Sequence, residues 1–238
     1  MTTAASRSSW PDPWPGREKA VPKRRPLSRE RIVEAALAII DSEGLDALSM
    51  RRVAQELDTG AASLYAHVSN KDELIEQVLD LVHAQIEHEE PDPERWQEQI
   101  KDLMRRGRAA LISHRDIARA AVLANVPTTP HAMDTTEAML AILRAGGLDE
   151  QTAAYGVELL GLYVTATAFE ESSRAGLTQA DFEAYTGGVR EYFSTIPADR
   201  YPMITSLAGA LTRSVGDERF EFGLDILVAG LARTSGGR

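Results

Sequence analysis

Apolar residues recur at helical spacing in almost every segment from Ser28 onward, and this periodicity limits the fold more than any other feature of the chain. In the first such segment, Ile32, Ala36 and Ile40 follow the i, i+4 stripe of a helix with one buried face. No segment sustains the period-2 alternation of a half-buried strand. We therefore expect an all-α fold without a sheet.

Capping residues divide the N-terminal part into short helices. Ser28, Ser49 and Asn70 stand where helices would begin, since their side chains can accept a hydrogen bond from a free backbone N–H. Gly44 stands where the first helix would stop. Glu73, three residues after Asn70, can reach back to the start of its helix, as in a capping box. The sequence thus predicts three helices followed at once by a fourth.

The second and third of these helices, of about eight and seven residues, enclose a three-residue turn, Asp58–Gly60. This arrangement, at about residues 49–68, is typical of a helix-turn-helix motif, whose second helix enters the DNA major groove. Small residues would let that helix approach the bases, and longer ones could reach phosphates. The expected DNA contacts are Gly60, Ala61, Ser63, Tyr65, His67 and Lys71. A small all-α domain of any kind also has short helices joined by turns, so the pattern alone leaves both interpretations open.

Charge is distributed unevenly along the chain. The net charge is −10, yet residues 1–31 hold eight Lys/Arg against three Asp/Glu. Residues 1–25 are rich in Pro, Ser and Arg without apolar period, which predicts a disordered basic arm. A basic front on an acidic body favours an anionic partner such as double-stranded DNA, although a charged tail without a partner would look the same.

A break around Pro91 and Pro93 predicts a domain boundary, with a DNA-binding domain at 26–90 and a larger helical domain at 91–238. Gly146–Gly147 and Gly187–Gly188 are expected to stop helices, and the stretch from about 174 to 203 is expected to be less regular than its neighbours. The expected helices of this domain are 93–113, 115–124, 130–145, 149–174, 203–213 and 217–233.

Two of these helices have two apolar stripes, which indicates burial on two sides. On the last helix one stripe includes Phe220 and Leu224, and the other includes Phe222 and Ile226. The helix around Leu159 is similar. Two such helices could form a four-helix bundle with their twofold mates in a homodimer, while a single large monomeric core is the alternative.

The run "RERIVEAALAIIDSEGLDALSMRRVAQELDTGAASLYAHVSNKDELIEQVL" resembles the DNA-binding domain of the tetracycline-repressor (TetR) family of bacterial regulators. The matching parts are "EGLDAL", "LSMRRVAQEL" and "SLYAHVSNKDEL". The resemblance adds Arg51 to the expected DNA contacts. Many relatives have Gly where this chain has Asp58, but Asp tolerates the left-handed conformation, so we expect the turn to survive.

The C-terminal half, including "AMLAILRAGGLDEQTAAYGVELLGLYVTATAFEES", is similar to the ligand-binding and dimerisation domain of the tetracycline-repressor branch of that family. The resemblance implies an unknown small-molecule effector whose binding moves the two DNA-binding domains of the dimer apart and so releases DNA. Leu103 and Leu162 replace polar drug-binding residues, and no histidine lies in Ile117–Asn125, so a magnesium–tetracycline complex is not expected. The expected ligand-binding residues are Leu103, Val122, Asn125, Leu162, Phe169 and Glu170.

Catalytic and metal sites are not expected. His83 and His88 lie about 140° apart around their helix, Glu170 and Glu171 diverge on theirs, and the chain has no cysteine. No cofactor and no membrane span are predicted, and a cytoplasmic protein is the default. The resulting hypothesis is a dimeric, ligand-responsive repressor of a palindromic operator. The alternative is an all-α enzyme or small-molecule-binding protein without an operator.

Overall fold

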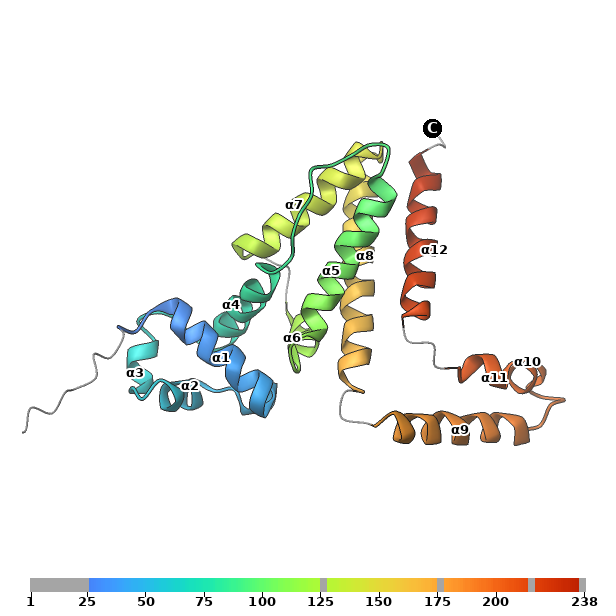
Figure 1. The fold of residues 1–238 in the computed structure, drawn as a ribbon, viewed down its shortest axis with the longest axis horizontal. Coiled ribbons are helices and arrows are strands. Elements are labelled where there is room, and N and C mark those ends of the chain that lie inside the picture. The colour runs from blue at the N-terminus through green and yellow to red at the C-terminus, as the bar shows by residue number, and fades with distance from the viewer. Residues whose placement is uncertain (1–25, 125–127, 175–177, 214–216, 236–238) are drawn as a thin grey trace, which may run out of the picture.

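The computed structural model describes residues 26–124, 128–174, 178–213 and 217–235, and every regular element within these ranges is a helix (Figure 1). The all-α prediction is confirmed. The predicted basic arm, residues 1–25, and the predicted ligand contact Asn125 lie outside the described residues. The helices of the first part are α1 (Arg29–Glu43), η1 (Leu45–Ala47), α2 (Met50–Glu56), α3 (Ala61–Leu64) and α4 (Lys71–His83). The later ones are α5 (Trp96–Ile112), α6 (Ile117–Leu123), α7 (Pro130–Ala145), α8 (Glu150–Ser172), α9 (Gln179–Thr195), α10 (Pro202–Ser206), α11 (Ala208–Leu211) and α12 (Glu218–Ser235).

The first three helices and the turn ending at Val68 form a unit that we call the reading head. Ser28 and Ser49 cap α1 and α2 as predicted, each accepting a hydrogen bond from a backbone N–H three residues later. Gly44 ends α1 with a φ of 93°, a conformation that favours glycine. Asp58 has a φ of 49°, so it takes the left-handed conformation at the turn. The local chemistry of the sequence therefore determines where this unit bends.

Helix α3 is shorter than predicted. It was expected to continue to about Val68, but it ends at Leu64 and gives way to a turn. In this turn the N–H of His67 donates to the carbonyl of Leu64 at 2.9 Å, and the N–H of Val68 donates to the same oxygen at 3.0 Å. A tightened last turn of this kind is common where a short helix has few bonds to propagate. Leu64 and Val68 are both buried, so the turn is still fixed from behind.

Helices α5 to α12 form a second part, which we call the sensor region. α5, α7 and α8 pack together at its centre, and α12 lies along α8 and α5. α4 connects the reading head to this bundle by packing on α1 at one end and on α7 and α5 at the other (Figure 1). The helices α9, α10 and α11 pack on one another and project away from the bundle.

Helix α9 corrects the sequence analysis. The stretch was expected to be irregular and Gly187–Gly188 were expected to stop a helix, but both glycines lie inside a helix of 17 residues. Each glycine costs such a helix about 1 kcal/mol relative to alanine. A complete capping box at its start, in which Thr178 and Asp181 exchange hydrogen bonds, favours the helix. By contrast, α7 does end at Gly146–Gly147 as expected.

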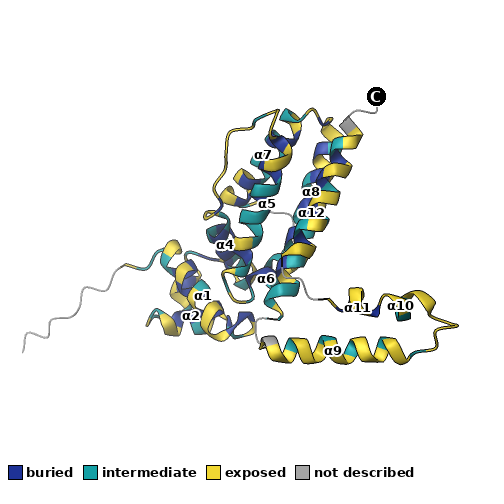
Figure 2. Ribbon diagram, turned by 45° about the vertical axis from the view of Figure 1, so that its right-hand side comes forward, coloured by how far each residue is buried: buried dark blue, intermediate teal, exposed yellow. Residues whose placement is uncertain are grey.

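The two stripes of α12 have different environments in the single chain (Figure 2). Phe220 and Leu224 are buried in the core, whereas Phe222 is 67% exposed and Ile226 is 54% exposed. α8 also has an exposed apolar stripe on one side, which includes Tyr155, Leu159, Leu162 and Phe169. These two neighbouring helices therefore present apolar faces that nothing in the described chain covers.

Candidate DNA-binding face and ligand pocket

The side of the reading head formed by α2, α3 and the following turn presents most of the predicted DNA contacts to solvent. Arg51 and Ser63 are exposed, and the ring of Tyr65 is 54% exposed although it is large and largely apolar. Behind them, Val53 and Leu64 are fully buried. The helix pair is thus held by its inner residues while its outer residues remain available to a partner.

The remaining predicted DNA contacts lie just before, within and after α3. A Cβ atom placed on Gly60 would meet no atom within 4 Å, so nothing in the described protein requires a glycine there. Ala61, His67 and Lys71 are partly exposed. Arg29 donates from Nε to the backbone carbonyl of His67 at 3.1 Å, which fixes the turn against α1. Asn70 caps α4 by accepting from the N–H of Glu73 at 2.8 Å, and the Glu73 carboxylate accepts from the N–H of Ser69 at 2.7 Å, which ties the residue before the cap to the helix.

A polar junction joins the reading head to the turn between α5 and α6. Asp41 accepts from the ring of His114 at 2.9 Å and from the N–H of Arg115 at 3.0 Å. Asp116 accepts from the N–H of Leu45 at 2.9 Å. Arg119 makes a two-pronged ion pair with Asp46, at 3.1 and 3.0 Å. Hydrogen bonds in both directions therefore tie the end of α1 and η1 to the sensor region.

A second connection runs from α4 to the start of α7. Asp80, which is 8% exposed, accepts from the backbone N–H of His131 at 2.8 Å and of Ala132 at 3.3 Å, and from the ring Nδ1 of His131 at 2.9 Å. Burial alone would raise the pKa of Asp80, but these hydrogen bonds and one from Thr129 hold the pKa below its ordinary value. A carboxylate from one helix thus caps the N-terminus of another.

The predicted ligand-binding residues occupy different environments. Leu103 is buried in the core. Val122 is 49% exposed at the end of α6, and Leu162 and Phe169 lie on the exposed stripe of α8. Glu170 is engaged by two arginines, since one carboxylate oxygen pairs with Arg174 and the other with Arg219. The hydrogen bond from Arg219, together with the charge of both arginines, lowers the pKa of Glu170. The sensor region contains a cavity, but it is lined by residues other than these.

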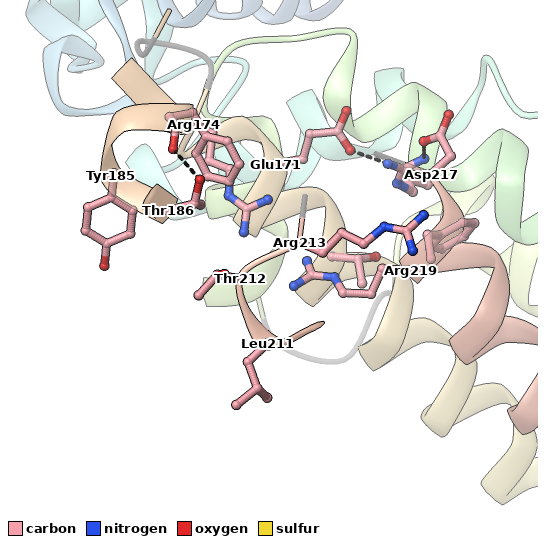
Figure 3. A pocket seen from close by; sticks show the side chains of 13 residues that line it. Glu171, Arg174, Tyr185, Thr186, Leu211, Thr212, Arg213, Asp217 and Arg219 are labelled. Atoms are coloured by element: carbon pink, nitrogen blue, oxygen red, sulfur yellow. Dashed lines mark hydrogen bonds and ion pairs between the residues drawn. The ribbon is translucent and has the colours of Figure 1, made fainter. Parts of the chain in front are cut away.

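That cavity, of about 300 Å³, lies where the C-terminal end of α8 meets α9, α11 and the start of α12 (Figure 3). Its wall includes four arginines, Arg108, Arg174, Arg213 and Arg219. The sequence analysis assigned no role to any of them. The spacing of Arg174 four residues after Glu170, on one helical face, was the available signal. The others come from α5, from the residues after α11 and from α12, and only the tertiary fold brings them together.

Other classes of site are not found in the part of the chain that the structure describes. There, no group of three or more His, Cys, Asp or Glu side chains is placed to hold a metal ion. Within the same ranges, no helix is long and apolar enough to cross a membrane.

Residues 32–78 match the family described as "Bacterial regulatory proteins, tetR family", and residues 90–235 match the one described as "Tetracyclin repressor-like, C-terminal domain". The chain belongs to the TetR family. With both parts present, this chain is a ligand-responsive, DNA-binding transcriptional repressor, and the alternative of an all-α enzyme or binding protein without an operator is not favoured.

Individual relatives agree with this assignment. The chain is 33% identical to the HTH-type transcriptional repressor DrrR1 of Streptomyces coeruleorubidus, over 88% of this chain and 80% of DrrR1. Among solved structures it is similar to apo ActR of Streptomyces coelicolor, with 48% identity, a TM-score of 0.82, and coverage of 89% of this chain and 98% of ActR. The structure of ActR in complex with actinorhodin is similar to the same degree, with 46% identity, a TM-score of 0.83, and coverage of 89% of this chain and 100% of ActR.

Proposed function

We propose that this TetR-family protein represses transcription by binding a palindromic operator as a homodimer in the cytoplasm, and that a small molecule releases it. The observation that carries the proposal is the exposed face of α2, α3 and the following turn, where Arg51, Ser63 and Tyr65 are exposed while Leu64 is buried behind them. This is the arrangement that a recognition helix needs, since its outer side chains must reach base edges and phosphates.

Individual roles follow from position. Tyr65 would contact a phosphate or a thymine methyl, and Arg51, His67 and Lys71 would contact the phosphate backbone. Gly60, Ala61 and Ser63 would allow the backbone to approach the groove closely. Because a Cβ on Gly60 meets no protein atom, a loss of affinity in Gly60→Ala with an unchanged melting temperature would report on the DNA rather than on folding.

The homodimer is supported by the exposed apolar stripes of α8 and α12. Tyr155, Leu159, Phe222 and Ile226 expose between 48% and 67% of their surface in the single chain. Contiguous apolar faces of this kind on adjacent helices are typical of a protein interface. Two copies related by a twofold axis would bury all four helices in one bundle and would place two reading heads for a palindromic site.

The effector is supported by the relationship to ActR. Because ActR is crystallised with actinorhodin, we propose actinorhodin or a compound resembling it as an effector of this protein. Leu103, Val122, Asn125, Leu162, Phe169 and Glu170 remain the proposed contacts in the sensor region. Magnesium–tetracycline should not shift the melting temperature, because this chain lacks the histidine that would bind the metal and the polar residues that would bind the drug.

The test is fluorescence anisotropy with labelled duplex from the region upstream of the protein's own gene. Tyr65→Ala and Arg51→Ala should each weaken binding at least tenfold, while Arg95→Ala, an exposed arginine at the start of α5, should leave it unchanged. Affinity should fall steeply as salt rises, because each phosphate contact releases counterions. Parent-like binding by both reading-head variants would refute the proposal. Actinorhodin should dissociate the complex.

A further inference from the structure

The wall of the cavity at the end of α8 is cationic in a chain whose net charge is −10. Arg108, Arg174, Arg213 and Arg219 line it, against only two acidic residues, Glu171 and Asp217. Figure 3 shows Arg174, Arg213 and Arg219 around the same opening, with Tyr185 and Leu211 at its outer edge. This composition sets the cavity apart from the acidic body that surrounds it.

The internal ion pairs leave part of this positive charge uncompensated. Both acidic residues of the wall are used by Arg108, which pairs with Glu171 and, at 2.8 Å, with Asp217. Arg174 and Arg219 share a single carboxylate, that of Glu170, so two guanidinium groups have one counter-charge.

The fourth arginine has the weakest partner. Among the residues that the structure describes, Arg213 reaches only Glu218, at 3.7 Å, and both side chains are 70% exposed. An exposed pair at that distance contributes almost nothing to stability, so the guanidinium group of Arg213 is available to another anion.

Aromatic rings hold two of these guanidinium groups in place. Arg108 lies over the ring of Phe220 at 4.6 Å, and Arg174 lies over the ring of Phe182 at 4.9 Å. Phe220 in turn stacks on Tyr163, with 5.6 Å between ring centroids. A guanidinium group fixed in this way is pre-organised, so it loses little freedom when it binds a carboxylate and can also stack on a flat ligand.

We propose that this cavity binds an aromatic acid, whose ring system lies against Tyr185 and Leu211 and whose anionic group is held by Arg174, Arg213 and Arg219. A volume of about 300 Å³ is at the lower end for drug-sized ligands, which suits a body of two or three fused rings. Charge-assisted hydrogen bonds to guanidinium groups would then select the anion over a neutral molecule of the same shape. This cavity is separate from the six contacts proposed above for the effector, so it would be a second ligand site and goes beyond the proposed function.

The test compares two probes of the same size by isothermal titration calorimetry on the full-length dimer. The probes are 2-naphthoate, an anion, and 2-naphthalenemethanol, its neutral analogue. The parent protein should bind the naphthoate at least about tenfold more tightly, as expected for one or two charged hydrogen bonds. Arg213→Gln and Arg174→Gln should each remove most of that difference without changing the affinity for the alcohol. Arg95→Gln, a matched exposed arginine outside the cavity, should bind both probes as the parent does.

Equal binding of the two probes, no binding of the naphthoate, or parent-like selectivity in both variants would overturn the proposal. Because Arg213 is exposed, its variant should fold normally, and a thermal melt checks this. A parallel anisotropy measurement with operator DNA separates the two proposals. A protein that binds its operator but does not distinguish the probes refutes only the aromatic-acid site, whereas one that binds no operator refutes the proposed function.

Discussion

Removing the carboxylate of Asp80 should weaken the protein substantially, although the residue lies far from the DNA-binding face. In Asp80→Ala the backbone N–H groups of His131 and Ala132 lose their acceptor, and Ala132 is only 3% exposed, so water cannot replace it there. A buried donor left without a partner costs about 1–3 kcal/mol, and losing a cap and an anion at a helix N-terminus adds about 1 kcal/mol. The ring of His131 is half exposed and regains water. We expect the free energy of unfolding to fall by about 3 kcal/mol.

Urea denaturation at a fixed protomer concentration measures this change, because the stability of a dimer depends on concentration. Asp80→Asn keeps one acceptor oxygen and should lose only about 1 kcal/mol. Glu76→Ala, an exposed carboxylate one turn earlier on α4, is the matched control and should change the free energy by less than about 0.5 kcal/mol. If Asp80→Ala is no less stable than this control, the hydrogen bonds between α4 and α7 do not contribute to the stability of the protein.

Three further outcomes are expected. Gly146→Ala should lose about 1–3 kcal/mol in urea denaturation, since its Cβ would lie 2.5 Å from ring atoms of buried Trp96; parent-like stability would contradict the packing. Burial lowers the pKa of His83, so the unfolded chain takes up its proton first and stability falls as pH drops below about 6.5. Between about pH 7 and pH 5.5, the free energy of unfolding of His83→Gln should fall less than that of the parent. The same fall in both proteins, measured by urea denaturation at each pH, would exclude this. Ile226→Lys should give monomers in analytical ultracentrifugation, whereas an unchanged dimer would place the interface elsewhere.

Features that depend on neighbours in the sequence could be predicted. Ser28, Ser49 and Gly44 fix helix ends through hydrogen bonds and φ angles that involve only a few adjacent residues. The left-handed Asp58 is a property of the residue itself. The helix-turn-helix could therefore be located to within a few residues, and only the length of α3 was wrong.

Features that depend on distant residues could not. In the sequence, Asp80 cannot be told from an ordinary charged residue on a surface helix. Its role becomes evident only from the fold, which places α7, some 50 residues later, beside it. The cationic cavity likewise assembles arginines from four separate segments. Helix α9 was missed for the opposite reason, because Gly187–Gly188 is a strong local signal that the capping box at Thr178 overrides.

The polar junction between the reading head and the α5–α6 turn restricts how this protein can recombine with its relatives. A chimera that receives a foreign reading head keeps His114 and Arg119 from this chain but loses Asp41 and Asp46, the acidic groups to which their side chains are bound. Operator specificity is therefore not freely transferable by exchanging a whole reading head, whereas an exchange of α3 alone leaves this junction intact. Positions 41 and 46 must be inherited together with their partners His114 and Arg119, although neither is among the proposed DNA or ligand contacts.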